Sequence, residues 1–137
     1  MPAPDPSRRV GRTVLIVEDD PEMLEYFEHV VREAGFSVLT ATDGLMAIQK
    51  MRDSKPDVVI LDLMLPKYGG VELLYELQTL GETRLIPLIV ATARDTDDAA
   101  RAAIVQRPNV AAFFEKPVSA EKLVDTLREI PAQPHKE

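Results

Sequence analysis

The sequence predicts an α/β fold in which a five-stranded parallel sheet carries helices on both faces. Two observations predict it. Short, continuous apolar runs alternate along the chain with longer stretches whose apolar residues recur at helical spacing. The runs do not alternate apolar with polar residues, which is typical of strands that are covered on both faces. Strand–helix alternation over 137 residues favours one domain with right-handed crossovers.

The expected strands are short and partly β-branched. Four strong ones and a weaker second one lie, in chain order, at 14–17, 37–41, 58–61, 88–91 and 111–114. Five strands of this size suit the order 2-1-3-4-5, although periodicity alone does not give an order. The predicted architecture is therefore a flavodoxin-like, doubly wound (βα)5 sandwich of three layers.

The expected helices lie between and after these strands. The first has an apolar stripe that ends at Ala34, and Gly35 then stands just past the helix end. Ser119 is a suitable N-cap for the last helix. Alanine-rich residues 99–106 are helical by propensity. The stripes of all five helices lie at 24–34, 44–53, 71–77, 99–106 and 123–130.

The composition excludes several classes of function. With 16 Lys and Arg against 23 Asp and Glu, the net charge of -7 argues against direct binding of nucleic acid or an anionic membrane. The chain has no cysteine and only two histidines, which excludes disulfides, thiolate metal sites and a multi-histidine cage. No apolar run is long enough to span a membrane, and the first residues lack the apolar segment of a signal peptide. We therefore expect a cytoplasmic protein.

The two ends of the chain differ in composition from the middle. Residues 1–12 are rich in proline and arginine, and residues 131–137 begin with proline and are polar. We expect both to be flexible tails that flank one domain at residues 13–130.

Polar side chains follow the expected strands at the point where each strand ends. Glu18-Asp19-Asp20 follow the first strand, Asp62 the third and Thr92 the fourth, while Lys116 comes one residue after the fifth. Ligands of such sheets bind beyond the carboxyl ends of the strands. If these strands lie side by side, the polar groups converge.

The converging groups indicate a particular chemistry. Several carboxylates in a small cleft raise each other's pKa unless a cation lies among them. An all-oxygen ligand set favours a hard divalent ion, Mg²⁺ or Mn²⁺. Lys116 adds a positive point charge and Thr92 a hydroxyl donor. This combination suits transfer of a phosphoryl group to a carboxylate.

Four segments resemble one known family. They are 15–21 (LIVEDDP), 59–66 (VILDLMLP), 90–94 (VATAR) and 114–117 (FEKP). Together they resemble the receiver domain of two-component response regulators, in the manner of single-domain chemotaxis regulators. The resemblance extends over about residues 12–130, and it depends on all four segments occurring in this order.

The resemblance implies a role for each carboxylate. Asp62 is expected to be the phosphoacceptor and also a ligand of the metal. Asp19 is expected to bind the metal directly, and Glu18 mainly through water. The backbone carbonyl of Met64 is expected to be the third protein ligand. Asp20 lies one place beyond the acidic pair of the family, and we treat it as ancillary.

The resemblance also implies a switch. Thr92 resembles the hydroxyl that grips a phosphoryl oxygen, and Ala93 the small residue that leaves room for the phosphoryl group. Phe113 resembles the switch aromatic, and Phe114 should face the other side of its strand. One departure from the family is the segment 107–110 before the fifth strand, which makes the interval from Thr92 to Lys116 long and puts the fourth helix and the switch in question.

Two further positions bear on the lifetime of an acyl phosphate. Met64 cannot orient water, because a thioether is at best a weak acceptor. Arg94 is a donor without an acceptor, so it cannot act as a base. We therefore expect slow self-dephosphorylation.

The expected function is that of a signalling switch and not of a turnover enzyme. Its partners would be a histidine kinase or a histidine phosphotransfer protein, and a downstream protein or an output domain absent from this chain. Two alternatives stay open. One is a degenerate receiver that only binds partners, and the other is an aspartate-nucleophile phosphatase of the haloacid-dehalogenase type. That phosphatase pattern needs a second aspartate two residues after the first, where this chain has Met64.

Overall fold

The computed structural model describes residues 12–63, 86–92, 98–107 and 109–131. The expected helix at 71–77, nearly all of both expected tails, and Met64, Ala93 and Arg94 lie outside these residues.

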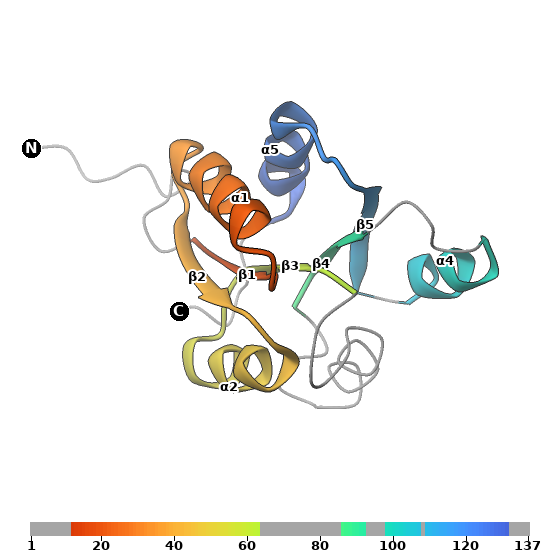
Figure 1. Cartoon of the computed structure of the whole chain (residues 1–137), viewed down its shortest axis with the longest axis horizontal. Coiled ribbons are helices and arrows are strands. Elements are labelled where there is room, and N and C mark those ends of the chain that lie inside the picture. Colours follow the sequence, from red (N-terminus) through yellow and green to blue (C-terminus); the bar gives the residue numbers. More distant parts are fainter. Residues whose placement is uncertain (1–11, 64–85, 93–97, 108, 132–137) are drawn as a thin grey trace, which may run out of the picture.

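Five parallel strands form one sheet in the predicted order. The strands are β1 (Thr13–Val17), β2 (Ser37–Ala41), β3 (Val58–Leu61), β4 (Leu88–Thr92) and β5 (Val110–Glu115). They lie in the order β2-β1-β3-β4-β5 (Figure 1). β1 lies between β2 and β3, so the chain reverses its direction of winding beside β1. This confirms the expected doubly wound architecture.

The described helices cover both faces of the sheet. They are α1 (Pro21–Glu33), α2 (Gly44–Ser54), α4 (Asp98–Val105) and α5 (Ala120–Glu129). Figure 1 shows α1 and α5 on one face, α2 on the other, and α4 beyond β5 at the edge of the sheet. The three layers of the prediction are therefore present.

Short polar residues begin the helices, as their backbone chemistry requires. The side chains of Asp20, Asp43 and Ser119 accept hydrogen bonds from backbone amides in the first turns of α1, α2 and α5. Pro21 adds a preset φ at the first position of α1. After α1, Gly35 adopts a φ of 101°, a conformation that a side chain disfavours.

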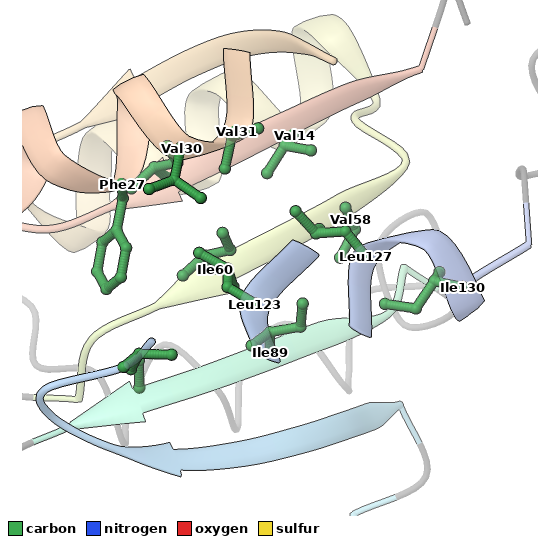
Figure 2. Close-up of a cluster of buried hydrophobic side chains, with 13 residues drawn as sticks. Val14, Phe27, Val30, Val31, Val58, Ile60, Ile89, Leu123, Leu127 and Ile130 are labelled. Carbon is green, nitrogen blue, oxygen red and sulfur yellow. The ribbon is translucent and has the colours of Figure 1, made fainter. Parts of the chain in front are cut away.

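The central strands β1, β3 and β4 are buried on both sides, which explains why they are continuous apolar runs. One cluster lies between the sheet and the pair α1 and α5, where Phe27, Leu123 and Leu127 meet Ile60 and Ile89 (Figure 2). The opposite cluster includes Met51 of α2. Because both faces of β1, β3 and β4 are covered, these strands fix the position of whatever follows their carboxyl ends.

A β-bulge sets which aromatic residue of β5 faces which cluster. Leu88 pairs with Val110, but the next residue of β4 pairs with Ala112, so Ala111 is an extra residue. After the bulge, Phe113 packs against the cluster that contains Met51, and Phe114 packs against the other. The expectation that the two rings face opposite sides is confirmed.

The amino end of the sheet is closed by side chains. The guanidinium of Arg12 donates to the carbonyl of Ile130 after α5, and it lies 5.5 Å from the centre of the Phe36 ring. The buried carboxylate of Asp57 accepts from the amide of Thr13 at 2.7 Å. These contacts join the start of β1 to the end of α5 and the start of β3.

None of the helices within the described ranges combines the length and the apolar character that a membrane crossing demands.

Candidate functional site

Three carboxylates meet where β1 and β3 end. Val17 and Leu61 are partners in the sheet, so the residues that follow them emerge side by side. Glu18, Asp19 and Asp62 each offer an oxygen, and these oxygens lie within 4.8 Å of one another. The amide of Asp62 donates to the carbonyl of Val17 at 3.1 Å, which holds the two strand ends together. The predicted convergence of these side chains is present.

Lys116 reaches this cluster from the end of β5. Its Nζ lies 2.6 Å from Oε1 of Glu18 and 3.2 Å from Oδ2 of Asp62. Its amide donates to the carbonyl of Thr92 at 2.8 Å, which fixes the backbone from which the side chain extends. One ammonium therefore bridges two carboxylates that would otherwise repel each other.

Burial governs the electrostatics of the cluster. The side chain of Glu18 is 1% exposed and that of Lys116 is 18% exposed. Burial raises the pKa of Glu18 to about 7, and the neighbouring charge of Asp62 acts in the same direction against the opposing contact with Lys116. Burial alone would lower the pKa of Lys116, but its hydrogen bond to Glu18 and the charges of Asp62 and Glu18 outweigh burial and raise it. The site therefore carries an excess of negative charge that one lysine does not fully offset.

The three consecutive acidic residues have three different environments. Glu18 is buried and pairs with Lys116, whereas Asp19 is exposed. Asp20 caps α1 by accepting from the amide of Glu22 at 3.1 Å, and its own amide donates to Glu18 Oε2 at 3.2 Å. Asp20 thus has a structural role as a helix cap, which agrees with the expectation that it is ancillary to the acidic pair.

Thr92 and Phe113 lie on the neighbouring strands β4 and β5. Thr92 is buried at the end of β4, and its partner in the sheet is Glu115. Phe113 is half-buried two residues before Glu115. The expected switch pair is thus connected through the paired ends of two strands.

A groove borders the acidic cluster. It has a cavity volume of about 340 Å³ and is lined by Asp20, Glu22, Met23, Tyr26, Pro117 and Val118. The hydroxyl of Tyr26 donates to the carbonyl of Val118 at 2.8 Å and so joins α1 to the segment after Lys116. An apolar floor with a carboxylate rim therefore lies directly beside the site.

Sequence reasoning missed two contacts of this region. One is the bridge from Lys116 to Glu18, which is shorter than its contact with Asp62. The other is Arg101 of α4, whose guanidinium lies 4.8 Å from the centre of the Phe113 ring and 3.5 Å from Glu115 Oε2. The one available signal for Arg101 was a lone cation in an alanine-rich helix, which does not specify a partner.

The donor set is suited to a hard divalent cation. Glu18, Asp19 and Asp62 offer three carboxylate oxygens, and such ligands are those that hard cations take in proteins. One acidic group is accessible from outside while the other two are buried. Chemically, the site combines a buried carboxylate, a group of metal-binding oxygens and an ammonium.

Comparison with known proteins agrees with this chemistry. A family model described as response regulator receiver domain matches residues 14–128. The probable transcriptional regulatory protein TcrX of Mycobacterium tuberculosis is 35% identical over 85% of this chain and 48% of its own length. This chain thus spans about half the length of that relative.

Two solved structures of similar fold match this chain over nearly their whole length. A putative response regulator from Chloroflexus aurantiacus matches with a TM-score of 0.79 at 31% identity, over 87% of this chain and 96% of that one. The receiver domain of the sensor histidine kinase PA1611 from Pseudomonas aeruginosa matches with a TM-score of 0.78 at 25% identity, over 88% and 98%. That structure has a magnesium ion coordinated in its active site cleft.

Proposed function

This chain belongs to the response regulator receiver domain family, and from that premise we propose that Asp62 accepts a phosphoryl group from a phosphohistidine. The donor would be a histidine kinase or a histidine phosphotransfer protein. The domain that does this is residues 13–130, and it acts in the cytoplasm as a signalling switch without binding nucleic acid directly.

One observation carries the proposal. Lys116 Nζ lies between Glu18 and Asp62, at 2.6 Å and 3.2 Å, in a buried cluster that also brings Asp19 within reach. A carboxylate that only stabilises the fold does not need two further carboxylates beside it, because their repulsion is unfavourable. The arrangement suits an acceptor oxygen that is held next to positive charge.

The transfer step exchanges one bond to phosphorus for another. A carboxylate oxygen of Asp62 forms an O–P bond while the N–P bond to the donor imidazole breaks, and the leaving nitrogen keeps the electron pair of that bond. The product is an acyl phosphate on Asp62. Lys116, already in contact with Asp62 Oδ2, stabilises the negative charge on the transferred oxygens.

A divalent cation would complete the site. Asp19 and Asp62 would bind it directly, Glu18 through water, and the backbone carbonyl of Met64, outside the described residues, would be the remaining protein ligand. Mg²⁺ is the proposed ion, with Mn²⁺ as its substitute, because both prefer oxygen ligands. When bound, such an ion offsets the charge that develops on phosphoryl oxygens.

The response to phosphorylation passes through the ends of β4 and β5, which are paired in the sheet. The hydroxyl of Thr92 donates to a phosphoryl oxygen, for which Ala93 leaves room, and Phe113 follows Thr92 inward. The resulting change at β5 and its neighbouring helices alters the affinity for a downstream protein or an output domain. The groove beside Tyr26 supports docking of the donor protein, because its lining includes Asp20 and Pro117, the chain neighbours of Asp19 and Lys116.

The test is phosphorylation by a small-molecule phosphodonor such as acetyl phosphate in the presence of Mg²⁺. Intact-protein mass spectrometry should show one added phosphoryl group on the parent chain and none on Asp62→Ala. A matched control is Asp125→Ala, which removes an exposed carboxylate from α5 and should leave phosphorylation unchanged. Phosphorylation that persists in Asp62→Ala would contradict the assignment, and so would a lack of phosphorylation in the parent chain.

A further inference from the structure

Arg101 connects α4 to two side chains of β5. Its guanidinium carbon lies 4.8 Å from the centre of the Phe113 ring, and its Nη1 lies 3.5 Å from Oε2 of Glu115. Phe113 and Glu115 are two residues apart, beyond the bulge at Ala111, so both project toward the same side of the strand. The guanidinium of Arg101 thus contacts two side chains on the same side of β5.

The strand segment that Arg101 holds is the one that leads into the site. Glu115 is the sheet partner of Thr92 and directly precedes Lys116, whose amide donates to the carbonyl of Thr92 at 2.8 Å. A movement of Thr92 or of the Phe113 ring therefore changes the contacts of Arg101 with Phe113 and Glu115. Figure 1 shows that α4 lies beyond β5 at the edge of the sheet, beside the strand that Arg101 contacts.

We propose that Arg101 is a positioning residue that holds Phe113 in its resting place and so opposes the phosphoryl-induced switch. This inference rests on the proposed function, because it assumes that Phe113 moves inward when Thr92 engages a phosphoryl oxygen. In the structure the guanidinium covers the ring and pairs with Glu115, and the proposal takes this arrangement as the resting state. When the ring turns inward, it leaves the guanidinium, so the stacking contact is lost and the pairing with Glu115 is no longer held in this geometry.

The expected strength of this restraint follows from its exposure. The side chains of Arg101 and Glu115 are 40% and 34% exposed, so water and salt screen their attraction. An exposed ion pair and an exposed cation–π contact are each modest. Together they correspond to about a threefold to tenfold bias toward the resting state. Because coupling is reciprocal, removing Arg101 should favour phosphoryl binding by the same factor.

The experiment measures that coupling with beryllofluoride, a non-covalent mimic of the phosphoryl group, in the presence of Mg²⁺. Amide and aromatic NMR signals of α4 and Phe113 report the fraction of switched protein during a titration. In Arg101→Ala, half-saturation should occur at a beryllofluoride concentration about threefold to tenfold lower than in the parent chain. Arg101→Lys keeps the charge but not the planar stacking group, and it should lie between the two.

Two matched variants separate this effect from a general change in stability. Arg32→Ala removes an arginine from an exposed ion pair with Glu28 on α1 and should leave half-saturation unchanged. Glu115→Gln removes the ion pair but keeps the ring contact, and it should give a smaller decrease than Arg101→Ala. Urea unfolding of each variant verifies that it is folded over the whole titration.

The outcomes are distinguishable. If the parent chain shows no saturable response, or if Asp62→Ala shows the same one, then the proposed phosphoacceptor function fails. If the parent responds and Arg101→Ala has an equal or higher half-saturation concentration, the proposed function stands and the role of Arg101 is refuted. An effect of Arg32→Ala as large as that of Arg101→Ala would also refute it.

Discussion

Replacing Glu18 with glutamine should make the metal-free protein progressively more stable, relative to the parent chain, as the pH rises from about 4.5 to about 8. Glu18 is buried beside Asp62, and burial raises its pKa to about 7 from 4.5. The fold therefore holds the proton of this carboxyl more tightly than the unfolded chain does. Its contribution to stability is fully present below pH 4.5 and is lost as the pH rises to 7. Glutamine cannot lose a proton, so the variant avoids that loss.

The size of the effect follows from the two pKa values. Each pKa unit corresponds to about 1.4 kcal/mol, so a change from 4.5 to about 7 corresponds to about 3 kcal/mol. The measured quantity is the unfolding free energy of Glu18→Gln minus that of the parent chain. We expect this difference to increase by about 3 kcal/mol between pH 4.5 and pH 8. A constant offset, caused by the lost pairing with Lys116, does not alter this pH-dependent part.

The assay is urea unfolding of both proteins at several pH values, with a chelator present to remove divalent ions. Glu25→Gln is the matched control, because Glu25 is an exposed glutamate on α1 away from the pair. The difference between Glu18→Gln and the parent should rise with pH and level off above pH 7. Excess Mg²⁺ should reduce the difference at pH 8, since a bound cation favours the charged form of Glu18.

A difference that stays constant within about 0.5 kcal/mol from pH 4.5 to 8 would refute the reasoning, because about 3 kcal/mol is expected. So would a difference that falls as the pH rises, since that sign requires a lowered pKa. Either result would mean that Lys116 offsets the cost of burying the charge of Glu18.

Three further predictions follow from the same structure. Asp19→Ala should leave the fold intact but weaken Mg²⁺ binding by at least about tenfold, measured by titration, because even an indirect partner of a metal contributes that much; unchanged binding would contradict its role. Leu123→Ala should lower the unfolding free energy, measured in urea, by about 2–5 kcal/mol, because it leaves a cavity in the cluster between α5 and the sheet. After phosphorylation and removal of the donor, the parent chain should lose its phosphoryl group more slowly than the double variant Met64→Asn, Arg94→Glu; equal or faster decay of the parent would contradict this.

Local signals were sufficient to predict most of the fold. A continuous apolar run predicts a strand with two covered faces, and Ser119 or Gly35 marks a helix end, because each depends on neighbouring residues alone. The order of the strands was expected only because five strands of this size suit 2-1-3-4-5, since periodicity alone does not give an order. The polar residues at the strand ends then converged because parallel strands end on the same side of a sheet.

Contacts that depend on distance in space were not predictable in this way. Lys116 approaches Glu18 more closely than Asp62, and this depends on the path of the backbone after β5. The long interval from Thr92 to Lys116 put the fourth helix and the switch in question, but it did not predict the extra residue at Ala111, which appears only in the register of β4 and β5. The partners of Arg101 depend on where α4 lies relative to β5, which no periodicity records.

The contact between Arg12 and Ile130 has a consequence for how this domain can be combined with others. Because of this contact, the first residue of the described fold lies beside its last helix end. A unit whose entry and exit adjoin can be inserted into a surface loop of a host protein, or joined end to end and opened elsewhere, without rearranging its core. Because this junction lies at the amino end of the sheet, and Glu18 and Lys116 lie at the carboxyl end, a host attached there would leave the acidic site accessible.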